Sequence, residues 1–275
     1  MEVIMNKFKL NLSSASQKLA AAVQLAEKCK AGSPAQYTDL PTLMYPFLNL
    51  ASEDKLLYLS WLVYTLISPM ERYPQILLVL EGPLGCGKTE LCDFTYNYLE
   101  HLKKIFKSDA KLEVNYFSPR TITSDKILVH DNQLTPEHVT DACKDVINSF
   151  NNGHKAAIIN GIKVDITDPL LADRTLKLTM PPLQNMLPLK ELYAKYDLVL
   201  GAIYAIFPRF MRQMYMTSPM ENQITSTSKR RLAMGGYELI GRKISTLLYN
   251  DENRFLDRYM KTQIQKAQDV TGQKP

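Results

Sequence analysis

The chain has 275 residues, of which 45% are hydrophobic and 22% charged, and it carries a net charge of +5 at pH 7. This composition excludes a disordered chain, and four cysteines without C-x-x-C spacing give neither a zinc site nor a disulfide framework. The apolar stretches are too short to span a membrane, and the first residues lack the apolar core of a signal peptide. We therefore expect a globular cytoplasmic protein, whose charge permits contact with nucleic acid without requiring it.

The first predicted elements are helical. Apolar residues recur at helical spacing in residues 9–31 and again in residues 53–67, where Ser52 offers a cap and Trp61 is expected in the core. This periodicity predicts a helical region over residues 1–70.

Between residues 71 and 185, short apolar strands alternate with helices. Continuous apolar runs of this length are typical of buried strands in a parallel sheet. The strands are predicted at residues 76–80, 126–129, 156–159 and 175–180. One helix is predicted at residues 90–99 and another over residues 136–150. The alternation predicts an α/β fold with a parallel sheet at its core.

A complete phosphate-binding signature, G-x-x-x-x-G-K-T, follows the first strand. Its residues are Gly82, Pro83, Leu84, Gly85, Cys86, Gly87, Lys88 and Thr89. A strand, a glycine-rich turn and a helix N-terminus form an anion site from backbone N–H groups. The motif predicts that Lys88 binds the β- and γ-phosphates of ATP and that the Thr89 hydroxyl is a ligand of Mg²⁺. A glycine-rich turn that binds nothing is the alternative.

An acidic residue follows the next apolar strand, as in a Walker B motif. Asp131 is predicted to hold Mg²⁺ close to Thr89, and a solvated loop acid is the alternative. Most ATPases of this type place a second carboxylate next, as the base for the attacking water, but this chain has Asn132. Because an amide can orient water but cannot take its proton, we expect slow hydrolysis or an acid supplied from elsewhere.

Two further polar residues are expected at the nucleotide. Asn160 follows the strand at 156–159 and would lie between the γ-phosphate and the attacking water, as in additional-strand ATPases; an Asn-Gly turn is the alternative. A short helix that begins at Asp168 delivers Arg174. Arg174 is predicted to stabilise transition-state charge at a neighbouring subunit's nucleotide, unless it pairs with Asp168 or Asp173.

The remaining residues, 186–275, are predicted to form a helical lid. Helical periodicity returns in residues 188–215 and 233–267. Between them lie three consecutive basic residues, Lys229, Arg230 and Arg231. These residues are candidates for contact with DNA phosphate, and a solvated helix face is the alternative.

Taken together, these residues resemble a known family. The phosphate loop, Asp131 with Asn132, the Ile-Asn-Gly-Ile run at 159–162 and the Pro-Leu-Leu-Ala-Asp-Arg run at 169–174 are similar to the ATPase module of phage and mobile-element primase-helicases. These proteins are relatives of the superfamily 3 helicases within the AAA+ group. The similarity covers about residues 47–260. It implies an AAA+-type P-loop core, a hexameric ring, ATP between subunits and DNA in the central pore.

The chain departs from this family at two points. Residues 1–70 have room for a small oligomerisation collar and not for a primase domain. Asp131 and Asn160 are 29 residues apart, an interval that in superfamily 3 helicases holds a helix and a long DNA-gripping hairpin. Here only a short turn remains after the predicted helix, and its basic residues, His154 and Lys155, are the candidates for DNA contact.

The main hypothesis is a ring-forming, Mg·ATP-dependent DNA motor that serves replication of a phage or mobile element in the host cytoplasm. Two other classes stay open. One is a helicase loader or remodelling ATPase that acts on a replication protein, which the short turn favours. The other is a nucleotide-switched scaffold in phage interference or defence, in which Asn132 slows turnover.

Overall fold

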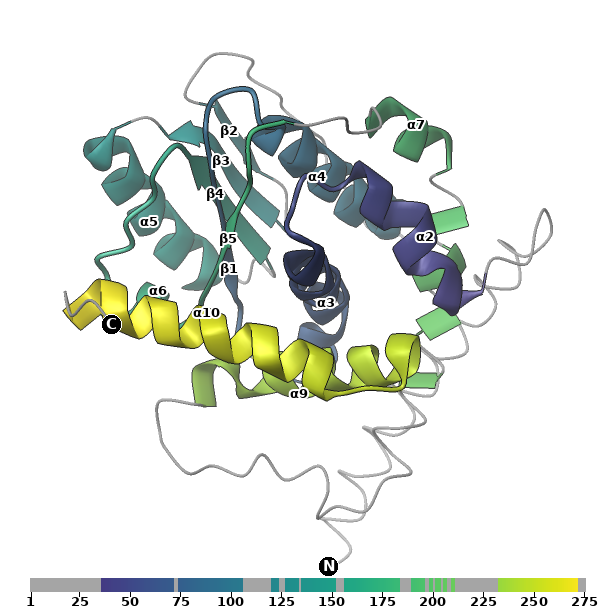
Figure 1. Cartoon of the computed structure of the whole chain (residues 1–275). Coiled ribbons are helices and arrows are strands. Elements are labelled where there is room, and N and C mark those ends of the chain that lie inside the picture. The colour runs from purple at the N-terminus through teal and green to yellow at the C-terminus, as the bar shows by residue number, and fades with distance from the viewer. Residues whose placement is uncertain are drawn as a thin grey trace, which may run out of the picture.

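A five-stranded sheet lies between two layers of helices (Figure 1). The computed structural model describes residues 36–71, 74–105, 120–123, 127–133, 135–151, 156–183, 189–195 and 232–271, with short pieces between 198 and 210. The strands are β1 (Leu77–Glu81), β2 (Arg120–Thr123), β3 (Ile127–Gln133), β4 (Ala156–Gly161) and β5 (Thr175–Thr179). Their order is β2-β3-β4-β1-β5, with β2 antiparallel to β3 and the other four strands parallel. The predicted α/β fold with a parallel sheet is confirmed.

Helices cover both faces of the sheet. The described helices are α2 (Leu40–Met44), α3 (Ser52–Glu71), α4 (Lys88–Ile105), α5 (Pro136–Asn151), α6 (Pro169–Ala172), α7 (Leu189–Ala194), α9 (Leu232–Tyr249) and α10 (Asn253–Thr271), with single turns at Tyr37–Asp39 and Tyr45–Phe47. α5 and α6 lie on one face, whereas α3 and α4 lie on the other (Figure 1). α9 and α10 run along the lower side of the molecule in this view.

The side chains of β1 divide between two hydrophobic clusters. Leu78 and Leu80 pack with α3, α4 and the C-terminal helices, whereas Leu77 and Val79 pack with α5 and α6. Because successive side chains of a strand point to opposite faces, a strand that is covered on both faces is apolar throughout. This explains the continuous apolar run in the sequence. Trp61, predicted in the core, is fully buried in the first cluster.

Polar contacts join α3 to the C-terminal helices. The Tyr237 hydroxyl donates a hydrogen bond to the Leu57 carbonyl at 2.8 Å. Arg258 donates two hydrogen bonds to the Asp54 carboxylate, at 2.6 and 2.8 Å, and the Asp54 side chain is 3% exposed. A bidentate pair of this kind is strong and fixes geometry. The described parts of the N-terminal and C-terminal regions therefore pack together against the sheet, and the domain boundaries near residues 70 and 185 stay a prediction.

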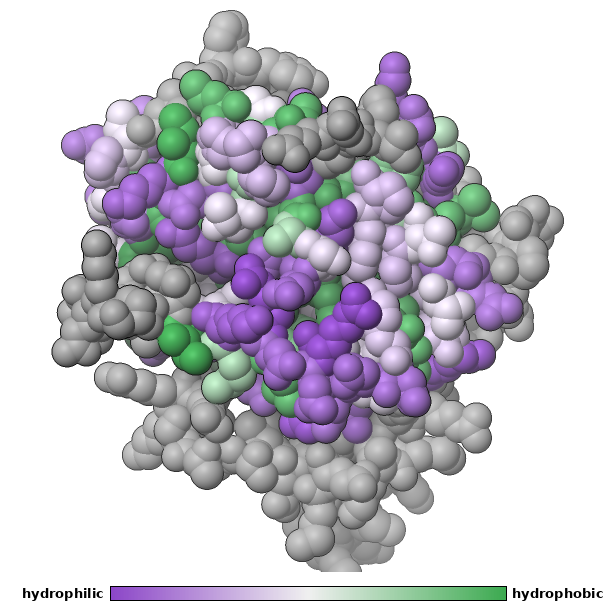
Figure 2. All heavy atoms as spheres, in the orientation of Figure 1, coloured by the Kyte–Doolittle hydropathy of each residue, from purple (hydrophilic) through white to green (hydrophobic). Residues whose placement is uncertain are grey.

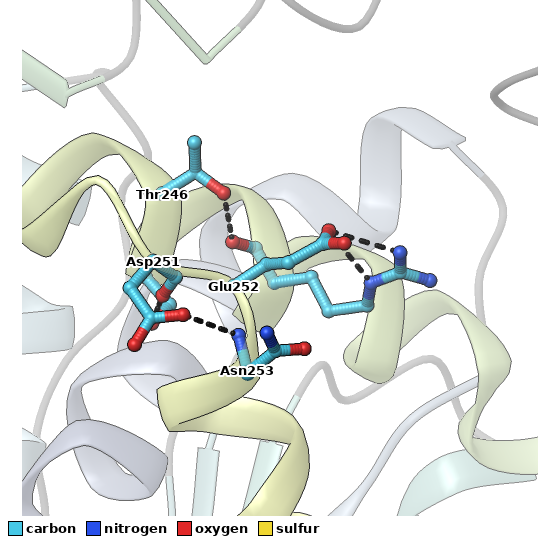
Figure 3. A network of polar contacts seen from close by, with 6 residues as sticks. Thr246, Asp251, Glu252 and Asn253 are labelled. Carbon is cyan, nitrogen blue, oxygen red and sulfur yellow. Dashed lines mark hydrogen bonds and ion pairs between the residues drawn. The ribbon is translucent and has the colours of Figure 1, made fainter.

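A tight turn separates α9 from α10, where the sequence predicts one helical stretch. Asn250 has a φ of 55°, a left-handed conformation that ends a helix and that asparagine tolerates. Figure 3 shows the polar network around this turn. The Asn253 N–H donates to Asp251 at 2.9 Å, and Arg242 donates to Glu252 at 3.2 and 2.9 Å. The network stabilises the reversal of direction between the two helices.

The outer side of α10 is polar. Figure 2 shows hydrophilic side chains gathered over this helix in the lower part of the visible face. On α10 itself, Phe255 and Tyr259 are buried, whereas Asp257 and Lys261 are exposed, as expected for an amphipathic helix. Within the described residues, no helix combines the length and the apolar character that crossing a membrane requires.

Candidate nucleotide-binding site

The loop between β1 and α4 carries the G-x-x-x-x-G-K-T motif, and its glycines are required by geometry. Gly85 and Gly87 have φ angles of 73° and 90°, in the left-handed region that favours glycine. A Cβ at Gly82 would lie 2.5 Å from the carbonyl oxygen of Met180. α4 begins at Lys88, so the first N–H groups of the helix, which no helical hydrogen bond uses, are at the loop. The motif therefore folds as the strand–loop–helix unit that the sequence predicts.

Lys88 is held inside this loop. Its Nζ lies 2.8 Å from the Gly82 carbonyl, 2.7 Å from the Pro83 carbonyl and 3.6 Å from Cys86 Sγ. Lys88 is 5% exposed, and an ammonium is costly to bury unless acceptors surround it. An incoming phosphate would offer this ammonium a charged acceptor, which binds it more strongly than neutral carbonyl oxygens.

Asp131 joins three elements at one oxygen atom. Its Oδ1 accepts a hydrogen bond from Thr89 Oγ1 on α4 at 2.9 Å and another from Asn160 Nδ2 on β4 at 2.6 Å. Asp131 is buried, so donors of this kind compensate for the loss of water around its charge. The structure thus brings together the two predicted Mg²⁺ ligands and the residue predicted beside the attacking water.

β3 continues two residues beyond Asp131, whereas the sequence predicts Asp131 at the end of the strand. Its pairing with β4 shifts between His130 and Gln133, and Gln133 Nε2 donates to the Asp131 carbonyl at 2.8 Å. Such irregularities often occur next to functional sites, where they change the direction of a side chain. Asn132 belongs to this irregular part of β3, and its side chain lies outside the described part of the structure.

Asn160 lies within β4. It is in register with Leu80 of β1, and the next residue, Gly161, is in register with Glu81. Its side chain is fully buried, and Nδ2 also lies 3.0 Å from Cys92 Sγ. The alternative of an Asn-Gly turn is therefore wrong, because both residues belong to the sheet.

Arg174 connects α6 to β5. The short helix predicted here is present as α6, and Asp168 caps it, since its carboxylate accepts hydrogen bonds from the N–H groups of Leu170 and Leu171 at 2.9 and 3.0 Å. The Arg174 side chain is partly exposed. Among the described residues, no carboxylate forms an ion pair with Arg174, so the alternative of a local pair with Asp168 or Asp173 is not observed.

Two residues that contact the site, Asn49 and Glu81, are not among those that the sequence predicts. Asn49 Nδ2 donates to the Cys86 carbonyl in the loop at 2.9 Å. Glu81, directly before the loop, lies 3.0 Å from Lys177 Nζ and accepts a hydrogen bond from the Val164 N–H at 2.9 Å. The one signal for Glu81 is a charge at the end of an apolar strand. No local pattern identifies Asn49, because 37 residues separate it from Cys86.

His130 precedes Asp131 in β3. Its Nε2 lies 3.6 Å from the Asp145 carboxylate on α5, and the ring is buried. Burial lowers the pKa of His130, and the charge of Asp145 opposes this effect without cancelling it. The imidazole is therefore neutral at pH 7, so it adds no positive charge next to Asp131.

The residues predicted to contact DNA lie outside the described part of the chain. They are His154, Lys155, Lys229, Arg230 and Arg231. The helix predicted at residues 9–31 lies outside it as well. These assignments therefore stay predictions.

Comparison with protein-family models, curated proteins and solved structures gives no match to this chain. Function is therefore inferred from the geometry of the site and from the sequence motifs. The strongest geometric feature is the convergence of α4, β3 and β4 on the Asp131 carboxylate.

Proposed function

We propose that this protein is a Mg²⁺-dependent ATPase with a P-loop core of the AAA+ type. The observation that carries the proposal is the meeting of Thr89 and Asn160 at one oxygen of Asp131, beside the loop that holds Lys88. P-loop ATPases use a hydroxyl and a carboxylate at these places for the metal ion. The strand order supports the AAA+ type, because β4 lies between β1 and β3. An extra strand at this position is the mark of additional-strand ATPases.

The residues that are present suit both the triphosphate and the metal ion. The left-handed conformations of Gly85 and Gly87 are those of a backbone nest that binds anions. Mg²⁺ prefers oxygen ligands and keeps several of its waters, so Thr89 and Asp131 are sufficient protein ligands beside phosphate oxygens. Among the described residues, no cluster of three or more His, Cys, Asp or Glu could hold a metal ion. The proposed Mg²⁺ site requires no such cluster, because phosphate oxygens and waters supply its other ligands. Bound Mg²⁺ would neutralise charge on the phosphates.

The groups of the chain then have separate tasks. Lys88 exchanges its carbonyl acceptors for phosphate oxygens. Thr89 and Asp131, which share a hydrogen bond here, would both turn oxygen atoms toward the metal ion. Asn160, which the same carboxylate orients, holds the attacking water. The Asn132 amide accepts no proton, so turnover is slow unless a carboxylate from elsewhere serves as the base.

Asp131→Asn tests the proposal. The substitution preserves size and removes the charge that holds the metal ion, so we expect ATP hydrolysis to fall by about 10²-fold or more. Phosphate release measured over a range of Mg²⁺ concentrations should then show no Mg²⁺ dependence. Asp165→Asn is the matched control, because Asp165 is exposed and its carboxylate pairs with Lys163 at 3.1 Å. Equal turnover in Asp131→Asn and the parent would contradict the proposal.

Asn132→Asp and Asn132→Glu test the missing base. A carboxylate can accept a proton from water. We therefore expect turnover either to stay similar or to rise, by at most about 10²-fold. Single-turnover phosphate release measures the chemical step directly. A collapse of activity in both variants would show that the amide has a positive role in the reaction.

We also propose that the ATPase acts as a ring on DNA, as a superfamily 3-like replicative helicase of a phage or mobile element. Two observations support this: the family resemblance of the sequence, and a partly exposed Arg174 that forms no ion pair among the described residues. Strand displacement on a forked duplex tests the helicase assignment. DNA-stimulated turnover without strand displacement would indicate a loader or remodelling ATPase. Tight nucleotide binding with very slow turnover would indicate a nucleotide-switched scaffold.

A further inference from the structure

An amide from outside the strand–loop–helix unit holds the phosphate loop. Asn49 belongs to residues 45–51 between α2 and α3, a segment that we call the strap. Its Nδ2 donates to the Cys86 carbonyl at 2.9 Å and to the Pro181 carbonyl at 2.7 Å, and Asn49 is 8% exposed. Because both partners are carbonyl oxygens, only the NH₂ end of the amide suits this position. The two hydrogens of the nitrogen serve one acceptor each.

The bond to Cys86 fixes the peptide unit that joins Cys86 to Gly87. In a trans peptide, the carbonyl and the following N–H point in opposite directions. With the Cys86 oxygen held against the strap, the Gly87 N–H points away from the strap. In the proposed nucleotide site, this N–H would face the bound phosphate. Gly87 has the left-handed conformation, φ 90°, that successive N–H groups need in order to form an anion nest.

The bond to Pro181 extends the same grip to the segment after β5. The preceding residue, Met180, donates its N–H to the Glu81 carbonyl at 2.7 Å. The Met180 carbonyl also packs so closely on Gly82 that no Cβ fits there. Asn49 therefore joins Cys86 in the loop to the segment at Met180 and Pro181, and Gly82 at the start of the loop packs against the same segment.

The strap is anchored in the hydrophobic core. Leu48 and Leu50 are buried on either side of Asn49. Lys55 Nζ donates to the Tyr45 carbonyl at 2.7 Å, which ties the start of the strap to α3. The amide thus reaches the loop from a position that its neighbours determine, and little side-chain freedom is lost in forming the two bonds.

We propose that Asn49 is a positioning residue of the nucleotide site, which holds the Cys86–Gly87 peptide in the orientation that binds the β-phosphate of ADP and ATP. The inference rests on the proposed nucleotide-binding function. Asn49 acts through the loop backbone, so its effect requires a ligand whose phosphate lies in the loop. AMP lacks a β-phosphate and gains little from this orientation.

Asn49→Asp and Asn49→Ala both remove the two donated hydrogen bonds. Competition against a fluorescent ADP analogue, with Mg²⁺ present, measures the affinities for ADP and AMP in the parent and in each variant. We expect the ratio of ADP to AMP affinity to fall about tenfold to a hundredfold in both variants, because a backbone donor to a charged group is misaligned. AMP affinity should change little. Asn49→Asp preserves shape and Asn49→Ala adds no charge, so agreement between them excludes simple repulsion of the phosphate.

Arg258→Met is the matched control, because it leaves buried Asp54 without its partner and touches α3 instead of the loop. We expect a lower melting temperature for this control with an unchanged ADP-to-AMP ratio. If both Asn49 variants also changed the melting temperature and left the ratio of ADP to AMP affinity unchanged, the inference would be overturned. A parent protein that binds no Mg·ADP would instead refute the proposed function, and the inference with it.

Discussion

Lys88→Ala is expected to abolish ATP hydrolysis, with a loss of about 10³-fold, and to weaken nucleotide binding. The Lys88 ammonium is held inside the loop by two carbonyl oxygens, and in the proposed ATPase it would exchange them for oxygens of the β- and γ-phosphates. Alanine leaves this phosphate charge without its cation. Phosphate release and equilibrium binding of ADP measure the two effects separately.

A melting curve distinguishes this loss from unfolding. Because a buried ammonium is costly to desolvate, removing it should leave the melting temperature of the nucleotide-free protein similar or higher. Lys163→Ala is the matched control, since the Lys163 side chain is 76% exposed and pairs with Asp165 on the surface. We expect this control to hydrolyse ATP normally. Hydrolysis at the parental rate by Lys88→Ala would place the active site elsewhere.

Arg174→Ala is expected to reduce turnover by about 10³-fold while ATP binding stays nearly intact. Arg174 follows α6, and no acidic partner neutralises it among the described residues. In the proposed ring it acts on the neighbouring subunit's nucleotide, so its loss affects transition-state charge and spares binding within its own subunit. Turnover and nucleotide affinity, measured on the same preparation, give the two values.

Mixing two inactive variants tests whether sites are shared between chains. Lys88→Ala subunits retain Arg174, and Arg174→Ala subunits retain an intact loop, so mixed rings should recover part of the activity. Arg242→Ala controls for the loss of an arginine, because Arg242 pairs with Glu252 at the α9–α10 turn. Absence of recovery in mixed rings that are shown to form would contradict a shared site. A strict monomer in every nucleotide state would contradict the ring.

The sequence predicts the centre of the fold well, because local patterns determine it. A strand covered on both faces must be apolar throughout, and β1, β4 and the start of β3 have this pattern. β2 is missed, since four residues at the edge of the sheet carry too little pattern. The break between α9 and α10 is missed because the signal is one asparagine with a φ of 55°, within a stretch of continuous helical periodicity.

The candidate site divides in the same way. Lys88, Thr89, Asp131 and Asn160 stand at fixed places relative to strands and glycines, so motifs identify them before the structure brings three of them to one oxygen atom. Asn49 cannot be identified in this way. Its partners lie 37 and 132 residues away, and only the packing of the strap against the sheet brings them within hydrogen-bonding distance.

The strand order has a consequence for how the protein is made. β1 pairs with β4 and β5, and the second hydrogen bond of Asn49 goes to Pro181, after β5. The ribosome must therefore add about a hundred residues after the loop before the site can form. At about 5–20 residues per second, this takes roughly 5–20 seconds. In the proposed ATPase, nascent chains in that interval have the complete motif but no assembled pocket. Cellular ATP then stabilises the finished protein and none of its precursors, so a product truncated before β5 is left to proteases without that protection.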